Sequence, residues 1–190
     1  MHPAYVIRPG AASDLDQLPD IERAASTLFV TVGGWEQDDV PQYVLSVEQH
    51  RAYLDADRLW VAVTKADDQP IGFAVASIVD GHGHLDEIDV HPDHGRRGIG
   101  RALVERVIVW ARESDLPAVT LTTERDIPWN APFYARLGFA ILADDALTEG
   151  LRAILAAEVA HGLNPATRVA MRYTIQNAAA DSQSNSNEQP

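Results

Sequence analysis

The 190-residue chain contains no cysteine. It therefore forms no disulfide, offers no thiol nucleophile and cannot build a cysteine-ligated zinc site. Long apolar runs are missing as well: no stretch approaches the roughly 18 apolar residues of a membrane span, and the N-terminal "MHPAYVIRPG" has no apolar segment after a basic start. We expect a cytoplasmic protein with neither a secretory signal nor a membrane partner.

Positive charge is scarce. Lys and Arg number 15 against 28 Asp and Glu, which gives a formal net charge of −13. A nucleic-acid-binding protein normally carries a basic face, so we expect no nucleic-acid partner. Three of the 15 basic residues lie within residues 96–101, and a basic loop on an acidic body favours a small anionic ligand. The acidic remainder favours cationic partners such as amines.

The apolar content is sufficient for one folded domain. Hydrophobic residues make up 46% of the chain, whereas residues 176–190 lack aromatics and aliphatic bulk. We predict a domain at 1–175 and a disordered tail at 176–190.

Hydrophobic periodicity predicts the order of the elements. The pairs Asp14/Gln17 and Ser46/Gln49 are predicted capping boxes for the first two helices. We expect strands at 5–8, 59–65, 71–79, 84–90, 118–123, 139–142 and 167–175, and helices at 14–29, 46–55, 98–113, 129–138 and, as an insert, 145–161. This order predicts a single mixed α/β (α+β) domain, with a mostly antiparallel sheet of about six to seven strands flanked by helices and a crossover through helix 98–113.

The stretch "DVHPDHGRRGIGRAL" (89–103) places two glycines and three arginines where a strand gives way to a helix. It matches neither the P-loop pattern, which needs Lys-Ser or Lys-Thr, nor the Rossmann fingerprint, whose third glycine falls on Leu103. Gly98 and Gly100 allow a ligand to approach the backbone, and the first amides of a helix bind anions. The pattern predicts a phosphate-binding loop, with further positive charge from Arg96, Arg97 and Arg101.

Two segments resemble the GNAT superfamily of N-acetyltransferases. "VHPDHGRRGIGRAL" is similar to the acyl-CoA loop pattern [Gln/Arg]-x-x-Gly-x-[Gly/Ala], although its first position falls on Gly95, and "WNAPFYARLGF" (129–139) resembles a later family segment. The resemblance covers about residues 4–175. It implies that strands 84–90 and 118–123 splay apart to form the acyl-CoA cleft. The implied acetyl-CoA contacts are the backbone at Asp89 and Val90 for pantetheine, the amides of 96–101 including Ile99 for pyrophosphate, and Asn130 and Tyr134.

The resemblance also implies the reaction, which is direct transfer of an acetyl group from acetyl-CoA to a primary amine in a ternary complex. Tyr134 is the expected general acid for the leaving thiolate and Glu87 the expected base. Four other side chains compete with Glu87 for the role of base: Asp86, Asp89, Glu124 and His84. We expect a small-molecule acceptor rather than a protein, and the sequence leaves a homodimer open.

The irregular segment 31–41 is predicted to lie at the mouth of the cleft. Its Trp35, Glu36, Asp38 and Asp39 would attract and cover a cationic amine.

Two alternatives belong to other classes. One is a non-catalytic acyl-CoA-binding module. The other is a metal-dependent hydrolase built on His82, His84, His91 and His94, but no third ligand follows with a recognised spacing. We therefore expect solvent-exposed histidines and no metal.

Overall fold

The computed structural model describes residues 4–31 and 44–176. Within these ranges the elements follow the predicted order: β1 (Tyr5–Pro9), α1 (Leu18–Thr31), α2 (Val47–Asp55), β2 (Leu59–Thr64), β3 (Pro70–Val79), β4 (His82–Val90), α3 (Ile99–Glu113), β5 (Ala118–Glu124), α4 (Ala131–Arg136), β6 (Ala140–Ile141), α5 (Glu149–Ala160) and β7 (Arg168–Thr174). Residues 177–190 of the predicted tail lie outside the described ranges. No helix within those ranges is long and apolar enough to cross a membrane.

The strands form one seven-stranded sheet in the order β1-β2-β3-β4-β5-β7-β6. Neighbouring strands run antiparallel except β4 and β5, which are parallel. A parallel pair needs a long crossover, and α3 supplies it. The predicted mixed, mostly antiparallel fold is therefore confirmed.

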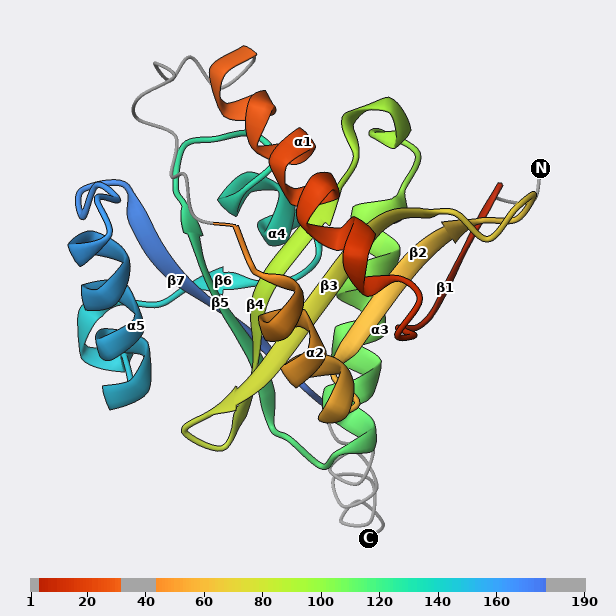
Figure 1. Cartoon of the computed structure of the whole chain (residues 1–190). Coiled ribbons are helices and arrows are strands. Elements are labelled where there is room, and N and C mark those ends of the chain that lie inside the picture. The colour runs from red at the N-terminus through yellow and green to blue at the C-terminus, as the bar shows by residue number, and fades with distance from the viewer. Residues whose placement is uncertain (1–3, 32–43, 177–190) are drawn as a thin grey trace, which may run out of the picture.

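Helices cover both faces of the sheet, so β2 and β3 are apolar throughout rather than alternating. In β2, Leu59, Val61 and Val63 face a core shared with α1 and α2. Trp60 and Ala62 face the opposite core, which α3 fills. Figure 1 shows α1 and α2 on one side of β2–β4 and α3 behind them, with α5 beside β7.

The two predicted capping boxes have different outcomes. Ser46 and Gln49 form the reciprocal box at the start of α2. The prediction for Asp14 is wrong, because its carboxylate accepts hydrogen bonds from the Arg8 guanidinium at 2.7 and 2.9 Å instead of capping a helix. A 3₁₀ turn (Leu15–Gln17) follows, and α1 begins only at Leu18. A charged partner on β1 thus outcompetes the local cap.

The predicted insert is a short 3₁₀ turn (Asp144–Ala146) followed by α5. Thr148 caps α5 by accepting a hydrogen bond from the Leu151 amide at 3.4 Å. The Gly150 amide donates to the Asp80 carboxylate at 2.8 Å, which joins the start of α5 to the turn between β3 and β4.

Candidate active site

β4 and β5 pair only through Gly83 with Val119 and His84 with Thr120. Beyond these two pairs the strands separate, so residues 85–90 of β4 have no partner strand on that side. We call this separation the β4–β5 divergence. It corresponds to the splayed strands that the sequence resemblance implies.

A buried hydrogen bond closes the narrow end of the β4–β5 divergence. The Thr120 hydroxyl donates to the Gly83 carbonyl at 3.2 Å and lies 2.9 Å from His84 Nδ1. Since the hydroxyl proton is already used, His84 Nδ1–H is the donor of the second bond. Burial lowers the pKa of His84 to about 4, so the ring is neutral at physiological pH. His84 is 2% exposed, and the prediction of a solvent-exposed side chain is wrong at this position.

The backbone of β4 alternates between its two neighbours. The His91 amide donates to the Ile71 carbonyl of β3 at 2.9 Å. Alternation then turns the Val90 and Ile88 amides away from β3, toward the β4–β5 divergence. The Asp89 carbonyl faces β3 so closely that a Cβ on Gly72 would lie 2.7 Å from it. Asp89 therefore offers the site its side chain and Val90 offers its amide, whereas the Ile88 amide donates to the Glu87 carboxylate at 3.2 Å.

The glycine loop starts where β4 ends. After a 3₁₀ turn (Pro92–His94), Arg96 and Gly98 adopt left-handed conformations with φ of 60° and 83°. α3 begins at Ile99, and its first amides have no partner within the helix. A Cβ on Gly100 would lie 3.7 Å from Phe133 of α4 and 4.0 Å from Val90. The loop therefore lies beside both β4 and α4.

The three arginines of the loop differ in their partners. Arg97 donates to the Asp93 carbonyl at 3.0 Å, and Arg101 pairs with Glu105 at 2.7 Å. Arg96 is exposed and has no polar partner among the described residues. Arg96 is thus free to contact an anion without breaking an existing bond.

A β-bulge in β4 decides which acids face the site. Leu85 pairs with Ala76 whereas Glu87 pairs with Val75, so Asp86 is an extra residue between them. The bulge turns Glu87 and Asp89 to the face that Val75 and Phe73 share with α1. Asp86 is exposed and accepts a hydrogen bond from Ser77 at 3.0 Å.

Helix α1 adds a third carboxylate. Glu22, Glu87 and Asp89 each have an oxygen within 4.8 Å of the other two, and we call them the carboxylate trio. Burial raises the pKa of Glu22 to about 7, and burial together with the Glu22 charge raises that of Glu87 to about 8. Burial and both neighbouring charges raise the pKa of Asp89 as well. The trio can therefore hold protons near neutral pH.

Tyr134 reaches the same site from α4. Asn130 opens this helix without using its side chain as a cap. The Tyr134 ring is 7% exposed and contacts Phe133 and Phe139 edge to face. Burial and then the charges of Glu87 and Asp89 raise its pKa above the ordinary value, so the phenol keeps its proton at neutral pH.

Glu124 is buried beside Arg168. It is 3% exposed, and its Oε1 lies 3.7 Å from Arg168 without a hydrogen-bond partner among the described residues. Arg168 pairs more closely with Glu158 of α5, at 2.6 Å. Arg168 also donates to the Thr122 hydroxyl at 3.2 Å. This network joins β5, β7 and α5, and it competes with any role of Glu124 as a base.

Two further predictions concern the acceptor segment and the histidine-based metal site. Residues 32–43 lie outside the described ranges, so the acceptor contacts of Trp35, Glu36, Asp38 and Asp39 stay predictions. In the described part of the chain, the trio is the group that brings three possible metal ligands together, and it contains no histidine. The histidine-based hydrolase therefore lacks the cluster that it needs.

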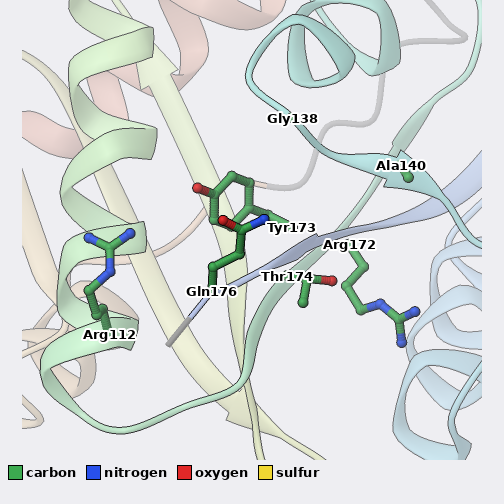
Figure 2. A pocket seen from close by; sticks show the side chains of 7 residues that line it. All are labelled: Arg112, Gly138, Ala140, Arg172, Tyr173, Thr174 and Gln176. Carbon is green, nitrogen blue, oxygen red and sulfur yellow. The ribbon is translucent and has the colours of Figure 1, made fainter. Parts of the chain in front are cut away.

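A cavity of about 500 Å³ lies away from all these side chains, between the C-terminal end of α3 and β7. In Figure 2, Arg112 and Arg172 lie at opposite sides of it and point away from each other. It contains no predicted site residue. The glycine loop is at the other end of α3, about 20 Å distant by helix length.

Comparison with known proteins agrees with this geometry. The sequence profile of the acetyltransferase (GNAT) family matches residues 18–139. The chain belongs to this family. The matched residues contain both the glycine loop and the β4–β5 divergence.

The chain is similar in sequence to curated acetyltransferases and in fold to solved structures. It is 33% identical over 91 residues to the peptidyl-lysine N-acetyltransferase YjaB of Escherichia coli (48% of this chain, 55% of that protein). It is 30% identical over 141 residues to a mycothiol acetyltransferase of Nocardia farcinica (69% of this chain, 43% of that protein). The chain thus spans about half the length of the curated relatives it matches. The coenzyme A complex of the PaiA N-acetyltransferase from Thermoplasma acidophilum has a similar fold, with a TM-score of 0.66 at 17% identity over 90% of this chain and 99% of that one.

Two side chains near the site were not predicted. Glu22 lies on the same helical face as Leu18, Ile21 and Ala25. A charged residue on the apolar face of the first helix was the sequence feature that could have identified it. Arg168 had no such signal, because it is the first residue of the last strand and its partners come from two other elements, β5 and α5.

Proposed function

We propose that the protein is an acetyl-CoA-dependent N-acetyltransferase that transfers the acetyl group directly to a primary amine in a ternary complex. The observation that carries the proposal is the β4–β5 divergence. The glycine loop, the carboxylates of β4 and Tyr134 of α4 all lie beside it.

The donor is proposed to bind along β4 and the loop. The pyrophosphate lies on the amides of 96–101, including those of Ile99 and Gly100, with Arg96 and Arg97 nearby. The pantetheine amides pair with the outward-facing backbone of Val90 and with the Ile88 carbonyl, as an added strand would. Asn130, whose side chain makes no capping bond, lies at the start of α4 beside the same path.

The chemistry follows from two side chains. The amine nitrogen attacks the thioester carbonyl carbon, the C–N bond forms and the C–S bond breaks. Glu87 accepts the proton that the attacking nitrogen loses, and Tyr134 gives its hydroxyl proton to the leaving sulfur. Exchange with solvent returns both groups to their starting states.

The acceptor must reach a partly enclosed site. Glu22 of α1 is 6% exposed, and Glu87 and Asp89 of β4 are half-buried and face α1. This favours a small or slender amine over the surface of a folded protein.

The test is release of CoA thiol from acetyl-CoA in the presence of a panel of amines, with mass spectrometry of the products. Because the chain has no cysteine, all thiol detected comes from CoA. We expect amine-dependent release with an equal amount of acetylated amine. Tight CoA binding without release on any amine would overturn the proposal and leave a binding module.

A further inference from the structure

Glu22 is a buried acid on a helix that belongs to neither sequence motif of the family. It is 6% exposed, and its two oxygens accept hydrogen bonds from the Leu45 amide at 3.2 and 3.1 Å. Burying a carboxylate is unfavourable unless other groups compensate it. A glutamate at this position therefore needs an explanation beyond packing.

The trio has more acceptor capacity than the described residues use. Each ionised carboxylate accepts about four hydrogen bonds. The described residues supply two donors, the Leu45 amide to Glu22 and the Ile88 amide to Glu87 at 3.2 Å. Asp89 Oδ2 is fully enclosed and has no hydrogen-bond partner among the described residues. Several lone pairs thus converge on one point beside Tyr134.

Positive charge near the trio is already committed elsewhere. Arg168 acts electrostatically on Glu87, but its guanidinium pairs with Glu158 at 2.6 Å and with Glu124 at 3.7 Å. An alkylammonium ion brings three donors and one positive charge, which matches three converging carboxylates. The ammonium charge in turn favours the ionised form of these carboxylates, and a second carboxylate on the ligand would then be repelled by them.

We propose that Glu22 is a specificity-determining residue, which with Glu87 and Asp89 binds the acceptor as an alkylammonium ion and excludes amines that carry a carboxylate on the neighbouring carbon. This inference rests on the proposed function and names its substrate class. Free diamines and lysine side chains share that chemistry, and α-amino acids do not. The trio also accepts the proton that the ammonium loses before attack, since near neutral pH its carboxylates take up protons readily.

The test compares Glu22→Gln with Asp20→Asn, which removes an exposed acid from the same helix. The glutamine carbonyl still accepts the Leu45 amide, so the variant should fold. Steady-state kinetics would use 1,4-diaminobutane, a short lysine peptide and alanine as acceptors.

We expect the wild type to prefer the first two acceptors to alanine. Glu22→Gln should raise their KM by about tenfold or more, with little change in the KM of acetyl-CoA, because a charge-assisted contact is lost. Glu22→Asp should recover part of the loss, and Asp20→Asn should behave as wild type. Comparing the KM of the diamine with that of the peptide shows whether the protein prefers a free amine or a lysine side chain as the acceptor.

Three outcomes would overturn the inference, and they are distinguishable. Thiol release with an unchanged acceptor KM in Glu22→Gln removes the role of Glu22 and leaves the proposed function intact. Release that requires added Mg²⁺ or Mn²⁺ and stops with a chelator makes the trio a metal site. No release with any amine overturns the proposed function together with the inference.

Discussion

Replacing Tyr134 with Phe removes the proposed proton donor and keeps its ring. The ring centroids of Phe133 and Phe139 lie 5.1 and 5.8 Å away, and both contacts survive the change. The Tyr134 hydroxyl has no hydrogen-bond partner among the described residues, so its loss leaves no unpaired group behind. Thermal stability should therefore change little.

The effect on the rate can be bounded. General acid catalysis contributes about 10²–10⁴-fold. The leaving thiol resembles that of Cys, with a pKa of about 8.5, and so needs less help than an alkoxide would. Because Tyr134 is 7% exposed, water substitutes for the donor only in part. We expect kcat to fall about tenfold to a hundredfold, or about 1.4–2.7 kcal/mol of transition-state stabilisation.

The assay is single-turnover acetyl transfer to the best acceptor, which separates chemistry from product release. Calorimetry should show unchanged CoA affinity. Tyr173→Phe is the matched control, since this tyrosine also contacts Phe139, at 5.5 Å, but lines the cavity at the far end of α3. A Tyr134→Phe variant with the wild-type transfer rate would refute the reasoning, and the thiolate would then leave without this donor.

Of four further predictions, one concerns the loop, two concern the base and one concerns the Arg168 network. Gly100→Val should weaken CoA binding by more than about tenfold in calorimetry, and unchanged affinity would show that the pyrophosphate does not bind at the loop. Gly98 is a poor target, because a side chain at its φ of 83° would strain the backbone. A base with a pKa of about 8 must lose its proton to act, so kcat/KM should rise with pH up to about 8, and Glu87→Gln should lose this limb. Because the pKa of Glu87 is raised, the folded state binds one more proton than the unfolded state between pH 4.5 and 8, and it loses stability as the pH rises through this range. Glu87→Gln should therefore have a higher melting temperature than the wild type at pH 9 and a similar one at pH 4. Equal melting temperatures at both pH values would contradict the raised pKa. Arg168→Leu should lower the free energy of unfolding by about 3–5 kcal/mol, because it breaks a buried pair. Arg23→Leu, which breaks an exposed pair, should lower it by less than about 1 kcal/mol. Equal losses in denaturant titration would show that the Arg168 network contributes no more than a surface ion pair.

Local patterns predicted the elements well where local interactions decide them. The Ser46/Gln49 box needs only four consecutive residues, and it forms as predicted. Asp14 has the same kind of pattern, but Arg8 lies close enough to take its carboxylate. A short-range rule fails there because a stronger charged partner comes from another element.

The base could not be chosen from the sequence because strand alternation is broken at that point. A regular β4 would place Glu87 and Asp89 on the same face as Leu85. The extra residue at Asp86 shifts the register by one and moves both acids to the α1 face. Glu22 joins them from a position 65 residues earlier in the chain, a distance over which periodicity carries no information.

The His84–Thr120 bond also sets how accurately the two halves of the sheet are aligned. It lies where β4 and β5 last touch, and each strand is otherwise attached to a different partner, β3 or β7. Glu87 lies three residues from that point, about 10 Å along the strand. A rotation of roughly 3° about the contact would displace Glu87 by about 0.5 Å, which is the tolerance of a working catalytic constellation. With Glu87 as the proposed base, catalytic accuracy would depend on a neutral imidazole and a hydroxyl that lie outside the proposed reaction centre.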